Sequence, residues 1–173
     1  MNAGKSTYLL QVAHNYRSNG SAVVLFTSQA DDRYGVGKIT SRLGISSDAE
    51  VYQPETNFED VLVADVACVL VDEAQFLTPT QVQQLHRWAH QKNVPVMCFG
   101  IRSDFQGQPF PGSAFLLALA DDLEEIKTVC ACGKKATMNM RVDEAGQRVS
   151  EGDQVFIGGN SRYRQVCAGC FYS

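Results

Sequence analysis

Near its start the chain carries Gly4, Lys5 and Ser6, whose types and order suit the binding of nucleotide phosphates. A glycine turn exposes backbone N–H groups to phosphate, the lysine reaches the β- and γ-phosphates, and the serine hydroxyl can bind Mg²⁺. Met1-Asn2-Ala3 would precede them in the same loop. Because the full pattern, G-x-x-x-x-G-K-[ST], normally follows a buried strand, we expect the sequence to lack the first strand of its sheet.

A second pair of residues that could do chemistry, Asp72 and Glu73, follows the apolar run at 68–71. In proteins with a phosphate-binding loop, an aspartate at the end of such a strand helps to hold Mg²⁺, and the next acid can act as a base. Taken alone, the pair has an ordinary alternative, a solvated strand end. Combined with Lys5 and Ser6, it favours a nucleotide site in which Ser6 and Asp72 hold Mg²⁺.

Four of the six cysteines form two close pairs, Cys130 with Cys132 and Cys167 with Cys170. Two such pairs, separated by a stretch rich in turn and strand residues, can close a tetrahedral Zn²⁺ site. The alternatives are two disulfides or unligated core thiols. Four cysteine ligands leave no position for a catalytic water, so we predict a structural zinc that shapes a loop.

Three weaker signals have a structural explanation beside a functional one. His86 and His90 lie four residues apart, but no glutamate follows His86 as in a zinc-protease helix, which favours surface histidines. The polar segment 31–33 follows an apolar run, where ligands bind in open α/β sheets. Phe105 and Phe110 flank a turn and are either core residues or a stacking surface for a base.

The elements that must position these residues alternate between strands and helices. Apolar runs at 22–26, 68–71 and 96–99 predict buried parallel strands, and helical spacing is seen over 7–19. Thr78, Pro79 and Gln81 predict a capped helix start. We therefore predict an α/β domain over 1–129, a P-loop NTPase-like parallel sheet with helices on both faces, and a small zinc-ribbon β module over 130–173.

Composition narrows the classes of partner and compartment. The 173 residues include 15 Lys+Arg and 19 Asp+Glu, so there is no basic stripe of the kind that binds a polyanion. Nucleic acid is therefore not an expected partner. The sequence shows neither an apolar run of about 18 residues nor a signal-peptide pattern, so we expect a cytoplasmic protein without a membrane partner.

Taken together, these motifs resemble those of the type II thymidine kinase family, and the resemblance is closest to its bacterial members. It implies ATP-dependent phosphorylation of the 5′-hydroxyl of thymidine or deoxyuridine in nucleotide salvage. It also implies a zinc-anchored lasso loop over the base and a homotetramer. The segments that carry it are 1–7, 31–34, 71–76, 104–107, the paired cysteines and 157–159.

The resemblance also implies roles for individual residues. Glu73 would accept the proton, while Lys5 and Arg33 would stabilise the transferring charge. ATP and its Mg²⁺ would contact Met1, Asn2, Ala3, Gly4, Lys5, Ser6, Asp31, Asp32, Arg33, Asp72, Glu73, Ala74 and Gln75. The nucleoside would contact Phe76, Phe105, Phe110, Gln154, Val155, Phe156, Ile157, Gly158 and Tyr163, in the lasso mostly through backbone groups.

Two other functions fit parts of the pattern. Asp72-Glu73-Ala74-Gln75 resembles a helicase-type acid motif, so a P-loop NTPase whose zinc ribbon acts on nucleic acid is one alternative. An inactive, truncated chain that only binds nucleotide or assembles is the other. Stimulation of ATP turnover by DNA would identify the first alternative, and thymidine-dependent turnover would exclude the second.

Overall fold

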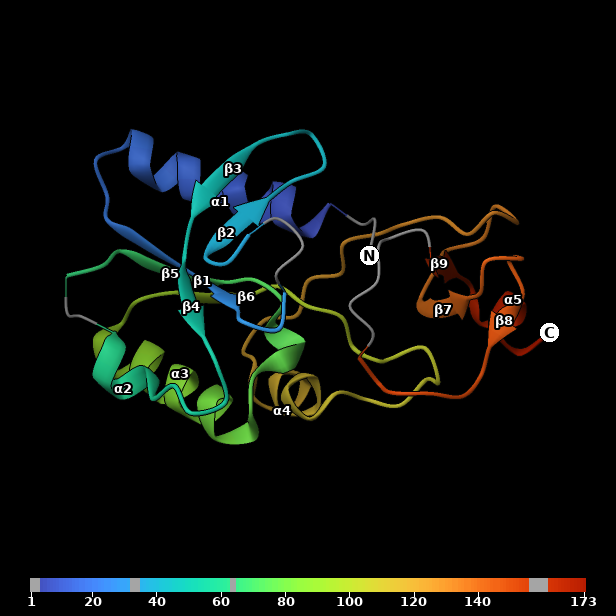
Figure 1. Cartoon of the computed structure of the whole chain (residues 1–173). Coiled ribbons are helices and arrows are strands. Elements are labelled where there is room, and N and C mark those ends of the chain that lie inside the picture. The colour runs from blue at the N-terminus through green and yellow to red at the C-terminus, as the bar shows by residue number, and fades with distance from the viewer. Residues whose placement is uncertain (1–3, 32–34, 63–64, 156–161) are drawn as a thin grey trace.

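A four-stranded parallel sheet forms the centre of the larger part of the molecule (Figure 1). The computed structural model describes residues 4–31, 35–62, 65–155 and 162–173. The strand order is β4-β1-β5-β6, and every neighbouring pair is parallel. Every residue of β5 is buried, as expected for a strand covered on both faces. The strands are β1 (Val23–Ser28), β4 (Glu50–Tyr52), β5 (Cys68–Val71) and β6 (Val96–Cys98).

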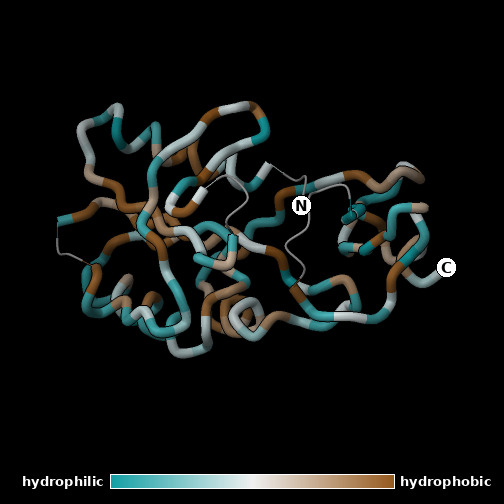
Figure 2. The backbone as a smooth tube through the Cα atoms, viewed as in Figure 1, coloured by the Kyte–Doolittle hydropathy of each residue, from teal (hydrophilic) through white to brown (hydrophobic). Residues whose placement is uncertain are grey.

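Helices cover both faces of this sheet. Successive side chains of β5 point alternately toward the helices on one face and those on the other. Cys68 and Leu70 pack in one apolar cluster with α1 (Lys5–Ser18). Val69 and Val71 point to the opposite face, into a cluster that contains residues of α2 (Phe58–Val61) and α3 (Pro79–Lys92). Figure 2 shows the hydrophobic residues concentrated in these central strands. The predicted mixed α/β class with a parallel sheet is therefore confirmed.

The start of α3 follows the capping chemistry that the sequence predicts. The Thr78 hydroxyl accepts a hydrogen bond from the backbone N–H of Gln81, whose side chain in turn accepts one from the Thr78 N–H. Pro79 occupies the first helical position. The buried Gln81 amide also donates to the carbonyls of Gln53 and Thr56, which ties the start of α3 to the segment after β4.

Other elements complete the larger part of the molecule. A short antiparallel hairpin, β2 (Lys38–Thr40) with β3 (Ser46–Asp48), lies beside α1 and was not predicted from the sequence. The 3₁₀ helix η1 (Ala74–Phe76) follows β5, and α4 (Pro111–Leu119) packs against η1 and α3. Among the helices of the described ranges, none is long and apolar enough to cross a membrane.

The C-terminal part has its own small sheet and core. Its three strands lie in the order β8-β7-β9 and are antiparallel, and the short helix α5 (Ala168–Tyr172) follows them. The core consists of Cys130, Ala136, Val166, Cys167 and Phe171. Figure 1 shows this part beside the sheet domain, with the chain running between them. The strands are β7 (Met138–Val142), β8 (Arg148–Val149) and β9 (Tyr163–Val166).

Candidate functional site

The residues predicted to bind phosphate, at the start of α1, meet the acid pair at the end of β5. Gly4, with φ 76° and ψ 16°, directly precedes α1, a left-handed conformation that glycine adopts easily. At the second residue of α1, the Ser6 hydroxyl donates a hydrogen bond of 2.9 Å to Asp72 Oδ2. Two motifs 66 residues apart are thus brought together at the helix N-terminus. Met1, Asn2 and Ala3 lie outside the described residues.

Asp72 is a buried carboxylate in a polar setting. The residue is 4% exposed, and its Oδ1 accepts a hydrogen bond of 3.0 Å from the backbone N–H of Glu73. Burial raises the pKa of the Asp72 carboxyl, and the nearby Glu73 carboxylate raises it further; Lys5 and the Ser6 hydrogen bond act in the opposite direction. A cation bound beside Asp72 would offset this cost of burying a charge.

Glu73 occupies an unusual backbone conformation at the turn from β5 into η1. Its φ of 50° lies in the left-handed region, which is uncommon for a residue other than glycine. Gln75 Nε2 donates to Glu73 Oε2 at 2.6 Å, and Tyr52 Oη donates to the Glu73 carbonyl at 2.8 Å. Gln75 therefore orients the Glu73 carboxylate, and Tyr52 holds the Glu73 backbone.

Tyr52 and the orienting role of Gln75 were not found from the sequence. Tyr52 is 1% exposed, and burial raises the pKa of its hydroxyl, which stays a donor to the Glu73 carbonyl. Gln75 is 3% exposed, and its Oε1 accepts a hydrogen bond from the Ile101 backbone. The contacts of Tyr52 with Glu73 and of Ile101 with Gln75 leave no signal in a single sequence, since each joins segments that are distant along the chain.

The segment after β1 reaches the same edge of the sheet. Phe26 of β1 pairs with Val71 of β5, so the residues that follow both strands leave the sheet at one edge. Asp31 lies there, with its N–H bonded to the Ser28 carbonyl at 3.0 Å. Asp32 and Arg33 lie outside the described residues.

The aromatic residues assigned to the nucleoside form two groups. The rings of Phe76 and Phe110 lie edge to face, with centroids 6.0 Å apart. Phe105 is 1% exposed, and the Arg141 guanidinium carbon lies 3.7 Å from its ring centroid. Phe105 is therefore a covered ring in this structure and not an open stacking surface.

One end of the expected lasso contacts the loop that carries Phe105, and the other contacts Arg141 of β7. Gln154 Nε2 donates to Asp104 Oδ2 at 2.9 Å, while Asp104 Oδ1 accepts the backbone N–H groups of Gln106 and Gln108. At the other end, the Tyr163 hydroxyl accepts hydrogen bonds from Arg141. Val155 is 40% exposed, and Phe156, Ile157 and Gly158 lie outside the described residues.

The four paired cysteines gather into one cluster. Their Sγ atoms all lie within 4.8 Å of one another, and Cys132 Sγ is 3.6 Å from Cys167 Sγ. All four are free thiols, so the disulfide alternative is not what the structure shows. The Cys132 backbone N–H lowers the pKa of Cys130 to about 6, whereas the Cys132 and Cys167 side chains raise the pKa of Cys170 to about 12. This donor set fits a thiophilic cation such as Zn²⁺.

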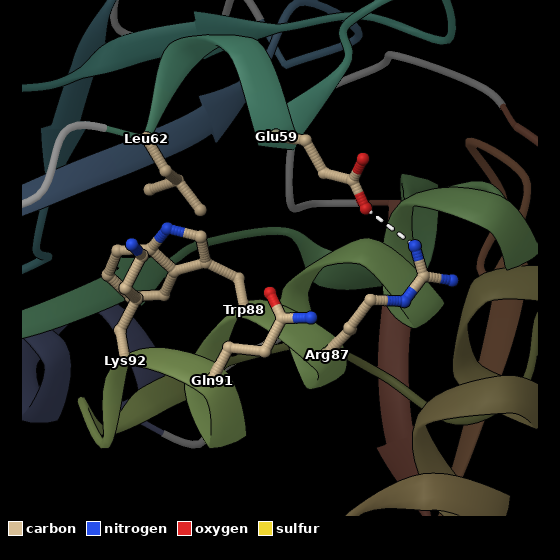
Figure 3. A pocket seen from close by; sticks show the side chains of 6 residues that line it. All are labelled: Glu59, Leu62, Arg87, Trp88, Gln91 and Lys92. Atoms are coloured by element: carbon tan, nitrogen blue, oxygen red, sulfur yellow. Dashed lines mark hydrogen bonds and ion pairs between the residues drawn. The ribbon is translucent and has the colours of Figure 1, made fainter.

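The two histidines and a hollow between α2 and α3 are made of residues outside the candidate site. His90 Nε2 lies 3.2 Å from Asp121 Oδ2 on the surface. A hollow of about 390 Å³ is lined by Glu59, Leu62, Arg87, Trp88, Gln91 and Lys92 (Figure 3). None of these residues was assigned to the site.

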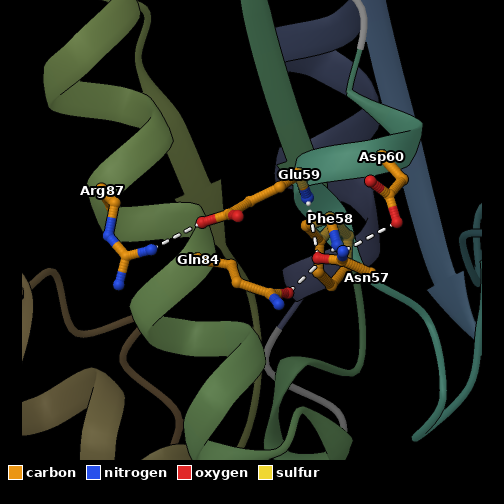
Figure 4. A network of polar contacts seen from close by, with 6 residues as sticks. All are labelled: Asn57, Phe58, Glu59, Asp60, Gln84 and Arg87. Carbon is orange, nitrogen blue, oxygen red and sulfur yellow. Dashed lines mark hydrogen bonds and ion pairs between the residues drawn. The ribbon is translucent and has the colours of Figure 1, made fainter.

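Polar contacts beside that hollow join α2 to α3, as Figure 4 shows. The Asn57 side chain caps α2 by accepting the Glu59 N–H, and the Phe58 N–H donates to Gln84 Oε1 at 3.1 Å. Arg87 and Glu59 form an ion pair with an N–O distance of 2.7 Å. The polar residues that line this side of the hollow therefore have a structural role, the joining of α2 to α3.

Comparison with known proteins identifies similar chains. A thymidine kinase family model matches residues 1–171. The thymidine kinase of Chromobacterium violaceum is 62% identical, over 99% of this chain and 94% of that protein. That of Albidiferax ferrireducens is 58% identical, over 99% and 88%. That of Escherichia coli K12 is 49% identical, over 96% and 84%.

Proposed function

Because this chain belongs to the thymidine kinase family, it is a kinase that phosphorylates thymidine with ATP in nucleoside salvage, and we propose how its residues do so. The family match over residues 1–171 carries the assignment, and the hydrogen bond that joins Ser6 to Asp72 at the end of β5 supports a phosphate site there. A nucleic-acid-dependent NTPase has no comparable support, since the thymidine kinase match spans nearly the whole chain. Deoxyuridine is proposed as a second substrate on the resemblance alone.

Glu73 is the proposed general base. As the 5′-oxygen of thymidine bonds to the γ-phosphorus, the bond from that phosphorus to the β–γ bridging oxygen breaks and ADP leaves. The hydroxyl proton passes to the Glu73 carboxylate. Gln75, which donates to Glu73 Oε2, fixes the orientation of that carboxylate, and Tyr52 fixes its backbone.

The residues around the start of α1 are proposed to hold the phosphates. Backbone N–H groups at Gly4 and in the preceding residues Met1, Asn2 and Ala3 would face phosphate oxygens, and Lys5 would neutralise charge on them. Ser6 and Asp72 would hold Mg²⁺, which would offset the charge of the phosphates when bound. Asp31, Asp32 and Arg33 would approach from the neighbouring strand end, and Ala74 and Gln75 from η1.

The nucleoside is proposed to lie between the sheet domain and the C-terminal part. Hydrogen bonds between Asp104 and Gln154 and between Arg141 and Tyr163 support this placement, because they join the proposed base-contacting segments. Phe76 and Phe110 would line the same pocket, and Val155, Phe156, Ile157 and Gly158 would close it. Zn²⁺ held by Cys130, Cys132, Cys167 and Cys170 would stabilise this part.

A cytoplasmic homotetramer is the proposed form of the protein. The family resemblance supports it, and α4 exposes the apolar side chains of Phe115 and Leu117, at 36% and 45%, which a subunit contact would cover.

Asp72→Asn tests the proposed Mg²⁺ ligand. We expect thymidine phosphorylation at limiting Mg²⁺ to fall by on the order of 10- to 100-fold. The melting temperature without nucleotide should not fall, because the amide removes a buried charge, its oxygen can accept the Glu73 N–H, and its NH2 can donate to the Ser6 hydroxyl. Activity would be titrated against Mg²⁺ and unfolding followed by calorimetry. Asp122→Asn, at an exposed position, is the control. An unchanged Mg²⁺ dependence would contradict the assignment.

A further inference from the structure

Arg141 is a buried cation that none of the assigned roles explains. It lies in β7, 7% exposed, and its guanidinium contacts three separate segments. Its Nε and Nη2 donate to the Tyr163 hydroxyl at 3.1 and 2.8 Å, and Nη2 also donates to the Asp153 carbonyl at 2.9 Å. Its Cζ lies over the Phe105 ring at 3.7 Å.

The positions of these partners along the chain define what Arg141 joins. Asp153 directly precedes the proposed base-contacting segment at 154–158, and Tyr163 ends the same loop. Phe105 belongs to the loop that follows β6 in the sheet domain. One guanidinium therefore fixes both ends of the lasso and sets them against the sheet domain.

We propose that Arg141 is a positioning residue for thymidine, acting through the ends of the lasso and not through contact with the nucleoside. The inference rests on the proposed function of residues 154–163. A planar guanidinium suits this task because it can donate in two directions while stacking on a ring, which an ammonium group cannot reproduce. Backbone groups that contact the base would be misplaced if the loop ends were released.

The surrounding contacts define a matched control. Arg148, in β8, makes a similar pair of contacts within the C-terminal part: its guanidinium lies 4.4 Å from the Phe171 ring centroid and donates to the Phe171 carbonyl. These contacts involve neither end of the lasso. Replacing Arg148 by lysine should therefore affect the stability of this part without a selective effect on thymidine.

The test compares Arg141→Lys with Arg148→Lys in the zinc-loaded protein. For Arg141→Lys we expect both the KM for thymidine and its Kd, measured by calorimetry without ATP, to rise by about 10- to 100-fold. We expect kcat and the KM for ATP to change by less than about threefold, with the zinc content unchanged. Arg148→Lys should leave the thymidine Kd within about twofold of the original.

A double-variant cycle tests whether Arg141 acts through Tyr163. Tyr163→Phe removes only the hydroxyl that accepts both guanidinium hydrogen bonds. If Arg141 positions this ring, the double variant should weaken thymidine binding by less than the product of the two single effects. Independent, multiplicative effects would overturn this route of action.

Three results would overturn the assignment of Arg141. The first is an unchanged thymidine Kd. The second is tighter thymidine binding, which would show that the side chain blocks the pocket. The third is an equal loss of ATP affinity, thymidine affinity and zinc content. Failure of the unaltered protein to bind or phosphorylate thymidine would instead overturn the proposed function itself. An error in the proposed function would therefore be detected with the unaltered protein, before the Arg141 variant is measured.

Discussion

Glu73→Gln is expected to lower kcat for thymidine phosphorylation by about 10²-fold or more while leaving thymidine affinity nearly unchanged. The amide has the shape of the carboxylate and keeps an oxygen that can accept the hydrogen bond from Gln75 Nε2. It cannot take up the proton of the attacking hydroxyl. Steady-state kinetics would give kcat, and calorimetry without ATP would give the thymidine Kd.

The control for this variant is Glu59→Gln on α2. Glu59 forms an exposed ion pair with Arg87, and such a surface pair contributes little to stability. Both residues lie outside the proposed site. Its replacement should leave kcat unchanged. If Glu73→Gln turned over at the original rate, another group would have to accept the proton, and the assignment of Glu73 would be wrong.

Cys167→Ser should remove the zinc, lower the melting temperature and weaken thymidine binding in the same protein. Cys167 is buried, belongs to the four-thiol cluster and accepts the backbone N–H of Cys170 at the start of α5. Structural zinc sites in small domains contribute on the order of 10 kcal/mol to folding. Because the same part carries Arg141 and Tyr163, its loosening should reach the nucleoside pocket.

Metal analysis and thermal unfolding under reducing conditions would measure these effects. Cys98→Ala is the matched control, because Cys98 is a free cysteine of β6 outside the cluster. It should retain one zinc per chain. Freshly purified, reduced protein that contains no zinc would contradict the structural-metal proposal, whatever the stability of Cys167→Ser.

The predictions that succeeded depend on local patterns. The strand at 68–71 was recognisable because four consecutive apolar residues fit a strand buried on both faces. The start of α3 was recognisable because the Thr78 and Gln81 side chains accept each other's backbone N–H, while Pro79 has no N–H that would need a partner. In both cases the physical cause lies within a few residues of sequence.

The contacts of Tyr52 and Arg141, which were missed, join distant segments. Tyr52 reaches Glu73 across 21 positions, and Arg141 reaches Tyr163 across 22. The sequence left Phe105 as either core or stacking surface, and only the three-dimensional position of Arg141 shows that the ring is covered. The hairpin β2–β3 was missed because its strands are three residues each and mostly polar.

The backbone of Glu73 has a consequence for evolution in the laboratory. A left-handed conformation at a residue with a side chain costs on the order of 1 kcal/mol, and glycine would relieve that strain. A screen that rewards heat resistance alone would therefore favour Glu73→Gly, and the selected proteins would be more stable but would lack the proposed proton acceptor. Selection for thermostability in this chain must therefore be combined with selection for thymidine phosphorylation. Otherwise Glu73 will be replaced and the activity lost.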